Sequence, residues 1–435
     1  MLKQLLRPFI PRSILLSYHR CRAHLTAFRF GYPGKKLRVI AVTGTNGKST
    51  VVEWIGQLLA LMGEPVGWIS TASVRIGDET KLNTTKLTTA DTSFLQSHLA
   101  KMVRAGAKYA VLEASSQGLA QGRLNGVPIQ GAVFTNLTPE HIEWHGSMLA
   151  YQRAKELLFQ RLMSSARVTD APKVSVVNGD DPVADAFLRY PADKKVVCTL
   201  YGSVHTKADV HRRAEIVEQN EKGTRIRIEE HEVFLPFLGR FNVMNALEAV
   251  AVLEQYGFPL AKLVPALAQL VPVPGRLEFI PSKRDFQILV DYAPEPASMQ
   301  ALYQVLEQLH PKRILHVFGS AGGGRDKSRR PVLGKWVAEH ADLAIVTNED
   351  PYDEDPEQII DDVVAGTKEA SPLRAQVERV SDRRQAIAHA LSLAKSGDLV
   401  VITGKASEQW LMGPKGTRQA WDDRQVVREE LGNRL

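Results

Sequence analysis

Residues 42–50 read Val42-Thr-Gly-Thr-Asn-Gly-Lys-Ser-Thr50, and this stretch decides the fold. An apolar run at 37–42 leads into it, and residues 49–62 carry apolar side chains at helical spacing. This pattern predicts a buried strand, a tight turn and a helix. At such a junction the backbone amides and the positive end of the helix hold a polyphosphate. The stretch therefore predicts a nucleotide-binding loop.

The loop departs from the usual phosphate-loop pattern in its spacing. The pattern G-x-x-x-x-G-K-[ST] would place a glycine at position 42, but this chain has Val42 there and its first glycine is Gly44. We expect Lys48 to bridge the β- and γ-phosphates and Ser49 or Thr50 to hold magnesium. The alternative is a plain strand-to-helix turn with a solvated Lys48. Glycines, lysine and hydroxyls in one strand-turn-helix setting favour nucleotide binding.

Short apolar runs alternate with helical patterns along the rest of the chain. Candidate strands lie at 109–112, 131–134 and 174–177, and after Val271-Pro-Val-Pro-Gly275 the pattern restarts at 287–290, 313–318, 344–347 and 399–402. The alternation predicts an α/β protein with a mostly parallel sheet covered on both faces, and residues 196–238 predict an antiparallel insertion. We divide the chain into a short basic and apolar segment (1–36), a central P-loop ATPase domain (37–273) and a C-terminal Rossmann-like α/β domain (274–435).

Composition excludes several classes of protein. With 44% hydrophobic and 24% charged residues among 435, the chain is neither disordered nor fibrous. Its two cysteines, Cys21 and Cys198, are too few for a disulfide framework and are not spaced as metal ligands, which favours a reducing, cytoplasmic setting. No stretch is long and apolar enough to cross a bilayer. The net charge of +7 comes without a basic stripe of interleaved aromatics, so nucleic acid is disfavoured and an anionic small substrate fits.

Three further sets of residues bear on the chemistry. Glu113 ends an apolar strand where open α/β sheets bind ligands, so it is a candidate magnesium ligand; the alternative is a cap of the next segment. His141 and His145 stand four residues apart as in zinc hydrolases, but Ile142 occupies the position where those enzymes carry glutamate, which argues against zinc. Lys155 lies near the apolar side of a helical pattern and, taken alone, is expected to snorkel.

A series of motifs follows the loop in a fixed order. They read EASSQGLAQGR (113–123), FTNLTPEHIEWHG (134–146), YQRAKELLF (151–159), GRFNVMNALEA (239–249), PVPGRLE (272–278), VDYAPEPASM (290–299), GGGRDKSRRP (322–331) and GKASE (404–408). In this order they resemble the Mur ligase family, ATP-dependent enzymes that add amino acids to the peptidoglycan stem peptide. Within that family they are most similar to the tripeptide synthetases, which add the third residue. The resemblance runs from about residue 37 to the C-terminus.

The resemblance implies an acyl-phosphate mechanism that uses ATP and Mg²⁺. A substrate carboxylate would attack the γ-phosphate of ATP, and an incoming amine would then displace phosphate. The catalytic and metal positions of the family fall on Lys48, Ser49, Thr50, Glu113, His141 and Lys155. Lys48 would stabilise the transferred phosphoryl group. Lys155 matches the lysine that the family carbamylates, which turns a cation into a carboxylate beside a second magnesium.

The resemblance also implies the binding residues. ATP would contact Gly44, Thr45, Asn46, Gly47, Lys48, Ser49 and Thr50 with its phosphates, Asn242 and Asn245 on its adenine side, and Asp291 with its ribose. The muramoyl-peptide acceptor would contact Thr88, Thr89, Ser115, Ser116 and Arg123. The incoming amino acid would place its carboxylate on Arg325 and its distal end near Asp350, Tyr352, Gly404 and Glu408.

The N-terminal segment departs from the family pattern. Residues 1–36 are too few for the UDP-binding domain that the tripeptide synthetases carry before the ATPase strand. The nucleotide end would then be held by the other domains or by a partner, or the acceptor is not UDP-linked. The segment is basic and apolar, which leaves two interpretations: packing against the ATPase domain, or contact with a membrane surface.

The amino-acid pocket departs from the family pattern as well. Ligases that add meso-diaminopimelate show Asp-Asn-Pro-Arg where this chain shows Glu349-Asp-Pro-Tyr352, so the arginine that reads the distal carboxylate is missing. Asp350 and Glu408 would make the pocket acidic, which favours a distal amine, as in lysine or another basic amino acid. Gln117 and Pro294 stand where the family often has histidine.

Together these features predict an ADP-forming amide ligase that adds an amino acid to a muramoyl-peptide-type acceptor in peptidoglycan precursor synthesis. Three alternatives stay open: a related ligase acting on another acid, as in folylpolyglutamate or cyanophycin synthesis; a P-loop phosphotransferase; and a non-catalytic nucleotide-binding scaffold for cell-wall assembly. The joint presence of Lys48, Glu113, His141 and Lys155 argues against the scaffold.

Overall fold

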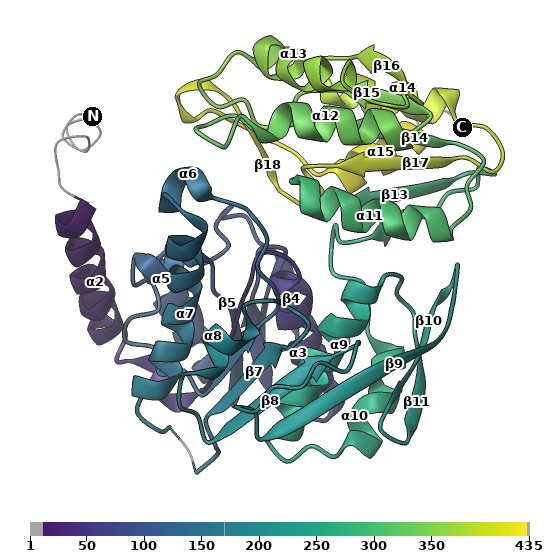
Figure 1. The fold of residues 1–435 in the computed structure, drawn as a ribbon. Coiled ribbons are helices and arrows are strands. Elements are labelled where there is room, and N and C mark those ends of the chain that lie inside the picture. The colour runs from purple at the N-terminus through teal and green to yellow at the C-terminus, as the bar shows by residue number, and fades with distance from the viewer. Residues whose placement is uncertain (1–11, 169, 433–435) are drawn as a thin grey trace.

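The computed structural model describes residues 12–168 and 170–432, and these form two large sheets with helices on both faces of each (Figure 1). The first sheet has eleven strands in the order β11-β10-β9-β8-β7-β6-β1-β5-β2-β3-β4. The second has six strands in the order β12-β13-β17-β14-β15-β16. The chain therefore completes one sheet before it starts the other, and the α/β fold class predicted from the sequence is confirmed.

The strands around β1 run parallel. Strand β1 (Arg38–Thr43) lies between β5 (Tyr109–Glu113) and β6 (Gly131–Phe134). Parallel pairing continues through β7 (Val174–Asn178), β8 (Lys194–Thr199) and β9 (Val210–Asn220), and on the other side through β2 (Val66–Ile69). Antiparallel strands complete both edges: β10 (Gly223–Ile228) and β11 (His231–Leu235) at one, β3 (Ser73–Ile76) and β4 (Glu79–Leu82) at the other. The predicted antiparallel insertion is thus one edge of this sheet.

Alternate residues of β1 point to opposite faces, and each face has its own helices. Ile40 and Val42 belong to the core under α3 (Lys48–Leu61), α9 (Arg240–Glu254) and α10 (Leu260–Ala266). Val39 and Ala41 belong to the core under α4 (Thr92–Arg104), α7 (Met148–Ser164) and α8 (Ala184–Leu188). Short helices α5 (Ser116–Ala120) and α6 (Ile142–His145) follow β5 and β6. Because both faces are buried, the centre of β1 is apolar without alternation.

The second sheet repeats this plan on a smaller scale. Strands β13 (Gln287–Asp291), β17 (Leu399–Thr403), β14 (Ile314–Phe318), β15 (Leu343–Val346) and β16 (Gln376–Arg379) are parallel, and β12 (Glu278–Phe279) is antiparallel at the edge. Helices α11 (Pro296–Gln308), α12 (Arg329–His340) and α13 (Pro356–Thr367) cover one face, and α14 (Arg383–Leu393) and α15 (Asp423–Gly432) the other. A separate ribbon joins β18 (Trp410–Met412) to β19 (Arg418–Ala420).

The predicted domain boundary between residues 273 and 274 stays a prediction. It falls between the last strand of the first sheet, which ends at Leu235, and the first strand of the second, which begins at Glu278. Within residues 1–36, helix α2 (Arg12–Arg29) lies beside α4, and the 3-10 turn η2 (Pro33–Lys36) follows it; residues 1–11 lie outside the described part. No described helix has the length and apolar character needed to cross a membrane.

Helices α12 and α13 approach closely at two buried glycines. A methyl group added to Gly334 of α12 would overlap the backbone carbonyl of Val363, and one added to Gly366 of α13 would overlap that of Pro331. Since backbone atoms cannot move aside as a flexible side chain does, the contact has no room for a larger residue. This helix pair supports the loops that follow β14 and β15.

We predict that Gly366→Ala destabilises the protein although alanine is the better helix former. The overlap with Pro331 should cost about 1–3 kcal/mol of unfolding free energy, as overpacking of a full core does. The matched control is Gly432→Ala, an exposed helical glycine with nothing near its added methyl group, which should be neutral or slightly stabilising. Urea unfolding followed by circular dichroism measures both; equal midpoints for the two variants would contradict the prediction.

Candidate active site

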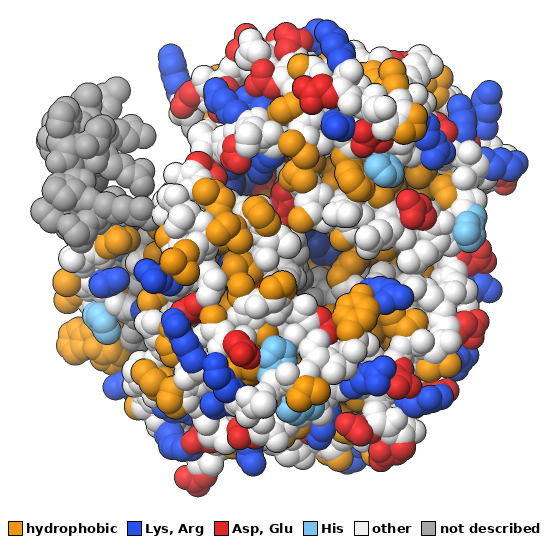
Figure 2. Space-filling view, viewed as in Figure 1, with side chains coloured by type: hydrophobic (Ala, Val, Ile, Leu, Met, Phe, Trp, Pro, Cys, Tyr) orange, Lys and Arg blue, Asp and Glu red, His pale blue; other side chains and the backbone are white. Residues whose placement is uncertain are grey.

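A cavity of about 370 Å³ lies where the carboxyl ends of both parallel sheets meet, and the surface is hollowed between the lower and upper parts of the molecule in Figure 2. Open α/β sheets bind ligands at this end of their strands. Most residues singled out from the sequence line it: Gly44, Thr45, Asn46, Gly47, Lys48, Ser49, Thr50, Thr88, Glu113, Ser115, Ser116, His141, Lys155, Asn242, Asn245, Asp291 and Arg325. Six others, Thr89, Arg123, Asp350, Tyr352, Gly404 and Glu408, lie outside the lining.

The loop between β1 and α3 is held by close backbone contacts. Gly47 caps α3 with a positive φ of 83°, and a methyl group there would overlap the amide oxygen of Asn245. A methyl group on Gly44 would overlap the hydroxyl of Thr135. The first turn of α3 leaves backbone N–H groups free of helical partners. The loop is therefore shaped to hold an anion at the helix end, as the sequence predicted.

Glu113 accepts hydrogen bonds from hydroxyl groups beside this loop. Its Oε2 accepts hydrogen bonds from the Ser49 hydroxyl at 2.9 Å and from the backbone N–H and hydroxyl of Thr71 at 2.6 and 3.0 Å. Lys48 Nζ lies 4.0 Å from Glu113 Oε1 and donates to the Thr45 carbonyl at 2.8 Å. A buried carboxylate beside a hydroxyl and a phosphate loop is the oxygen-rich setting that Mg²⁺ takes when nucleotide phosphates supply further ligands.

Lys155 is buried and points at the loop. Its side chain is 1% exposed, and Nζ donates to the Gly44 carbonyl at 2.5 Å and lies 4.2 Å from the centre of the Tyr151 ring. Burial, followed by the charge of Lys48, lowers the pKa of Lys155 well below its ordinary value. The snorkelling expected from the helix pattern alone is therefore wrong, because α7 faces the first sheet at this position.

His141 begins α6 and lies beside two carboxylates. Its ring nitrogens are 3.4 Å from Glu140 and 3.6 Å from Glu143, and burial lowers the pKa of His141. His145 instead contacts the Ser116 hydroxyl at 2.9 Å. The two histidines thus have separate partners, and among the described residues no three His, Cys, Asp or Glu side chains group as a metal site.

Residues of α9 and β13 also line the cavity. Asn242 donates to the Leu238 carbonyl at 2.8 Å, and Asn245 donates to the Asn242 side chain at 3.3 Å. Asp291 accepts from the backbone N–H of Leu277 at 2.8 Å, and burial raises the pKa of Asp291. Apolar side chains lie among these polar ones: Trp54, Phe237, Phe241, Met244 and Val273. An amide-bearing, partly aromatic wall of this kind suits a nucleobase.

The predicted acceptor residues form two layers. Thr88, Ser115 and Ser116 line the cavity. Behind them, the Thr89 hydroxyl is 3.0 Å from that of Ser115, and Arg123 donates to the Thr89 carbonyl at 2.5 Å. Arg123 thus contacts the backbone that carries Thr89.

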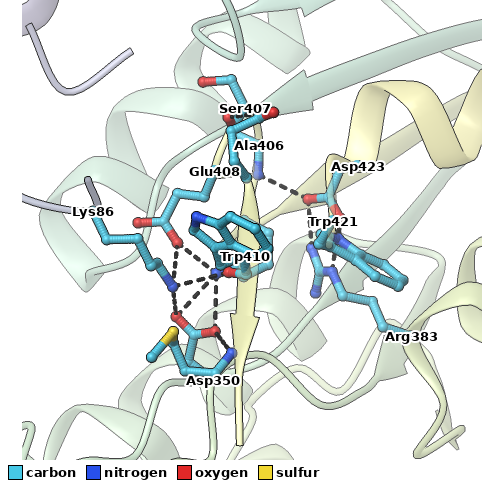
Figure 3. A network of polar contacts seen from close by, with 12 residues as sticks. Lys86, Asp350, Arg383, Ala406, Ser407, Glu408, Trp410, Trp421 and Asp423 are labelled. Atoms are coloured by element: carbon cyan, nitrogen blue, oxygen red, sulfur yellow. Dashed lines mark hydrogen bonds and ion pairs between the residues drawn. The ribbon is translucent and has the colours of Figure 1, made fainter. Parts of the chain in front are cut away.

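Of the predicted amino-acid residues, Arg325 lines the cavity and the others lie beyond it. Asp350 and Glu408 belong to the polar network of Figure 3, together with Lys86 and Lys405. Lys405 Nζ donates to both Asp350 oxygens at 2.9 Å and to Glu408 at 2.5 Å. Two carboxylates therefore face two ammonium groups, and the pocket does not carry the net negative charge expected from Asp350 and Glu408. The correction comes from Lys86, which the chain places 264 residues before Asp350.

Tyr352 and Gly404 shape the backbone beside this network. Tyr352 has a φ of 53°, and its N–H donates to the Met412 carbonyl at 3.2 Å. Gly404 has a φ of 108°, and a methyl group there would overlap the carboxylate of Glu349. Gly404 is thus required by the close approach of Glu349.

Several residues in or beside the cavity were not singled out from the sequence. Glu140 lies near four basic side chains, His141, Lys48, Lys155 and Arg325; burial opposes its charge, but these neighbours lower the pKa of Glu140. Glu295 of the second half accepts from Asn46 at 2.8 Å, and burial, followed by Glu140, raises the pKa of Glu295 to about 8. Arg276 reaches the Ser49 hydroxyl at 3.5 Å. Each lies inside or beside a quoted motif, which was the available signal.

Comparisons with known proteins were made on sequence and on structure. The model of the Mur ligase middle domain matches residues 42–253, and that of the Mur ligase, glutamate ligase domain matches residues 275–406. The chain is 34% identical over 430 residues to UDP-N-acetylmuramoyl-L-alanyl-D-glutamate–2,6-diaminopimelate ligase of Bacillus cereus, covering 98% of this chain and 84% of that protein. It is 36% identical over 423 residues to UDP-N-acetylmuramyl-tripeptide synthetase of Roseiflexus sp., covering 94% and 81%.

Solved structures are similar along most of the chain. A UDP-N-acetylmuramoyl-L-alanyl-D-glutamate–2,6-diaminopimelate ligase superposes with a TM-score of 0.59 at 34% identity, covering 92% of this chain and 79% of that one. Folylpolyglutamate synthase of Mycobacterium tuberculosis, complexed with ADP and AMPPCP, superposes with a TM-score of 0.67 at 17% identity, covering 88% and 92%. At that identity the second likeness concerns the fold alone.

A buried carboxylate next to the site gives a pH prediction. Burial raises the pKa of Glu53 to about 7 from 4.5, although hydrogen bonds from Ser70 and Ser73 oppose the shift. The folded protein thus holds this proton more tightly than the unfolded chain. Stability attached to Glu53 is therefore present at low pH and lost as the pH rises from about 4.5 to about 7.

We predict that Glu53→Gln matches the parent protein in stability near pH 4 and exceeds it by about 3 kcal/mol at pH 8. Glutamine keeps the oxygen that accepts from Ser70 and cannot ionise. Urea unfolding at both pH values measures the difference. Glu221→Gln, at an exposed position, is the control and should change stability equally at both; a pH-independent effect of Glu53→Gln would contradict the prediction.

Proposed function

The chain belongs to the Mur ligase family, and we propose that it uses ATP to join a free amino acid to a muramoyl-peptide acceptor in peptidoglycan precursor synthesis. The observation that carries the proposal is the meeting of three kinds of group in one cavity. A phosphate loop with Lys48, a carboxylate with hydroxyls around Glu113, and Arg325 from the second half all line it. These groups suit, in turn, a triphosphate, its metal and an amino-acid carboxylate.

The reaction proceeds in two balanced steps. An acceptor carboxylate oxygen attacks the γ-phosphorus of ATP, the bond to the bridging oxygen breaks, and ADP leaves. The amine of the amino acid then attacks the acyl carbon, inorganic phosphate leaves, and the amine loses a proton. Lys48 counters the charge of the transferred phosphoryl group. Bringing carboxylate, phosphate and amine together in one site converts improbable encounters into local steps.

Magnesium, when bound, neutralises phosphate charge and orients the γ-phosphate. Ser49, Thr50 and Glu113 would hold one ion, and His141 and a carbamylated Lys155 would complete a second site. The low pKa of Lys155 supports carbamylation, since a neutral amine is the form that reacts with carbon dioxide. As an ammonium, Lys155 would instead repel the metal.

The amino acid is proposed to carry an amine at its distal end. The relative from Bacillus cereus is named as a ligase of 2,6-diaminopimelate, a diamino acid. This chain has Tyr352 in place of the arginine of the Asp-Asn-Pro-Arg motif, and Asp350 in place of its asparagine. Against Lys405 alone, Asp350 and Glu408 leave one negative charge, which suits an ammonium group better than a second carboxylate.

The ligase proposal is tested by phosphate release from Mg-ATP with UDP-muramoyl-dipeptide and a panel of single amino acids. We expect release that requires both substrates and a product heavier by one residue in mass spectrometry. Lys155→Ala should lower turnover by about 100-fold or more while the protein still binds ADP. Lys101→Ala, an exposed lysine of α4, is the matched control and should leave turnover unchanged.

Other outcomes of this assay identify the alternatives. A phosphorylated acceptor formed without any amine would indicate a phosphotransferase. ADP binding without turnover on any acceptor, UDP-linked or lipid-linked, would indicate a scaffold. Turnover with a folate or a polypeptide carboxylate in place of the muramoyl-peptide would indicate a ligase for another acid.

We also propose that helix α2 rests on an anionic membrane surface. Ala23 and Ala27 face the body of the protein, and the opposite side of the helix exposes Tyr18, Leu25 and Phe28 at 54%, 69% and 71%. The helix carries no acidic residue, and its exposed basic side chains include Arg20 and Arg29. Figure 2 shows apolar and basic side chains together over this helix at the left. This combination is typical of helices that lie in a lipid interface.

Sedimentation with vesicles tests the membrane contact. Vesicles of phosphatidylcholine with about one third phosphatidylglycerol should carry the protein down, and pure phosphatidylcholine should not. The double variant Leu25→Asp/Phe28→Asp should lose binding, whereas Val204→Asp, an equally exposed apolar site elsewhere, should retain it. Binding that survives the double variant, or that is missing from both vesicles, would refute the contact.

A further inference from the structure

The ammonium group of Lys86 sits in a complete set of oxygen acceptors. Lys86 belongs to the loop between β4 and α4, in the first half of the chain. Its Nζ donates to Asp350 Oδ2 at 2.5 Å and to the Trp410 carbonyl at 3.0 Å, and it lies 3.1 Å from Glu408 Oε2. An ammonium has three N–H donors. Two hydrogen bonds and one ion pair, all with oxygens from the second half of the chain, therefore hold this ammonium group.

The acceptors are fixed without help from Lys86. Asp350 Oδ1 accepts from the Met412 N–H at 2.8 Å, and Lys405 holds both carboxylates from the other side. Nearby, Asp423 accepts from Ala406 N–H at 2.8 Å and from Arg383 at 2.7 and 2.8 Å, which ties down the loop that carries Glu408 (Figure 3). The second half thus presents a preformed ammonium site.

Lys86 has a backbone conformation that is unfavourable for a lysine. Its φ is 53°, the left-handed region that a non-glycine residue seldom adopts. A bond from the Trp410 indole N–H to the Thr84 carbonyl, at 3.0 Å, is the neighbouring link between the loop and the second half. Burial lowers the pKa of Lys86, against the attraction of Glu408. Lys405 belongs to the same half of the chain as the carboxylates of the network, whereas Lys86 reaches them from the other half.

Arg325, the residue proposed to bind the amino-acid carboxylate, is close enough to Glu408 of this site for their charges to interact. Burial works against the charge of Arg325, but Tyr292, Tyr352, Glu140 and Glu408 together raise the pKa of Arg325. The charges of Arg325 and Glu408 therefore interact, and Tyr352 contributes to the same shift in the pKa of Arg325. An amino acid anchored by its carboxylate on Arg325 would direct its side chain toward Glu408 and Asp350.

We propose that Lys86 is an internal occupant of the side-chain amine site and that the distal ammonium of the amino-acid substrate displaces it. This inference rests on the proposed ligase function and on the distal amine proposed above for its amino-acid substrate. A neutral side chain cannot replace the charge of Lys86 and is rejected, since Asp350 and Glu408 would lose a cation. Displacement also removes one of the contacts that hold the loop carrying Thr88, a residue of the cavity lining.

Calorimetric titration with L-lysine and L-norleucine tests the proposal, because the two differ chiefly in the distal ammonium. In Lys86→Met the apolar stem is kept and the competing charge is removed. We expect this full-length variant to bind L-lysine about 5-fold or more tightly than the parent protein, since no occupant has to be displaced. L-norleucine should bind the parent protein and the Lys86→Met variant with equal affinity. Lys81→Ala, an exposed lysine on β4, is the control and should behave as the parent protein.

A second variant keeps the test decisive if methionine packs poorly. Lys86→Ala should gain a thermal shift from ethylammonium chloride, which fits the vacated acceptors, and the parent protein should show none. L-lysine binding that is unchanged or weaker in Lys86→Met, with no ethylammonium effect in Lys86→Ala, would overturn the proposal and leave Lys86 as a link between the halves. These binding readouts need no turnover. A protein that binds as expected but makes no amide would refute the ligase and spare the ammonium site.

Discussion

The structure depends on a constraint at the phosphate loop: its backbone lies so close to its neighbours that two positions have no room for a side chain. Gly44 lies against Thr135 of the loop after β6, and Gly47 lies against Asn245 of α9. These contacts bring together the ends of β1 and β6 and the start of a helix almost 200 residues further along the chain. The cavity has its floor because these segments meet there, and Lys155 reaches the same backbone from α7.

The titratable groups around the base of the cavity do not form simple ion pairs. Burial drives Lys155 toward its neutral form and raises the pKa of Glu295. At Glu140 the effect of burial is outweighed by the neighbouring basic groups, which lower its pKa. Burial destabilises isolated charges in such a cavity. Binding of a polyanion together with cations supplies partners for these charges and therefore stabilises them. The same residues that cost stability in the free protein are thus the ones suited to hold a nucleotide.

Much of this arrangement was predictable from the sequence, and the rest was not, for a physical reason. The sheets follow from apolar runs of strand length, and the phosphate loop follows from glycines beside Lys48, because both signals are local. Glu140 and Glu295 stood inside quoted motifs, but nothing local says that they face one cavity. The pairing of Lys86 with Asp350 depends on how two separately built sheets meet. The acidic pocket inferred from Asp350 and Glu408 was wrong because two lysines face these carboxylates: Lys405, from the same motif as Glu408, and Lys86, from the other half.

Contacts across the two halves tie the nucleotide side of the site to the amino-acid side. Asn46 of the phosphate loop donates to Glu295, Arg276 reaches the Ser49 hydroxyl, and Lys86 enters the acceptors around Asp350. All three involve groups at or beside proposed ligand positions, so any ligand that changes one contact changes the distance between the halves. In-line transfer from a phosphate on one half to an amine on the other needs that distance set to within a fraction of an ångström. Substrates can replace these polar contacts with contacts of their own. An apolar interface between the halves would hold them together equally well, but its strength would not change when a substrate binds.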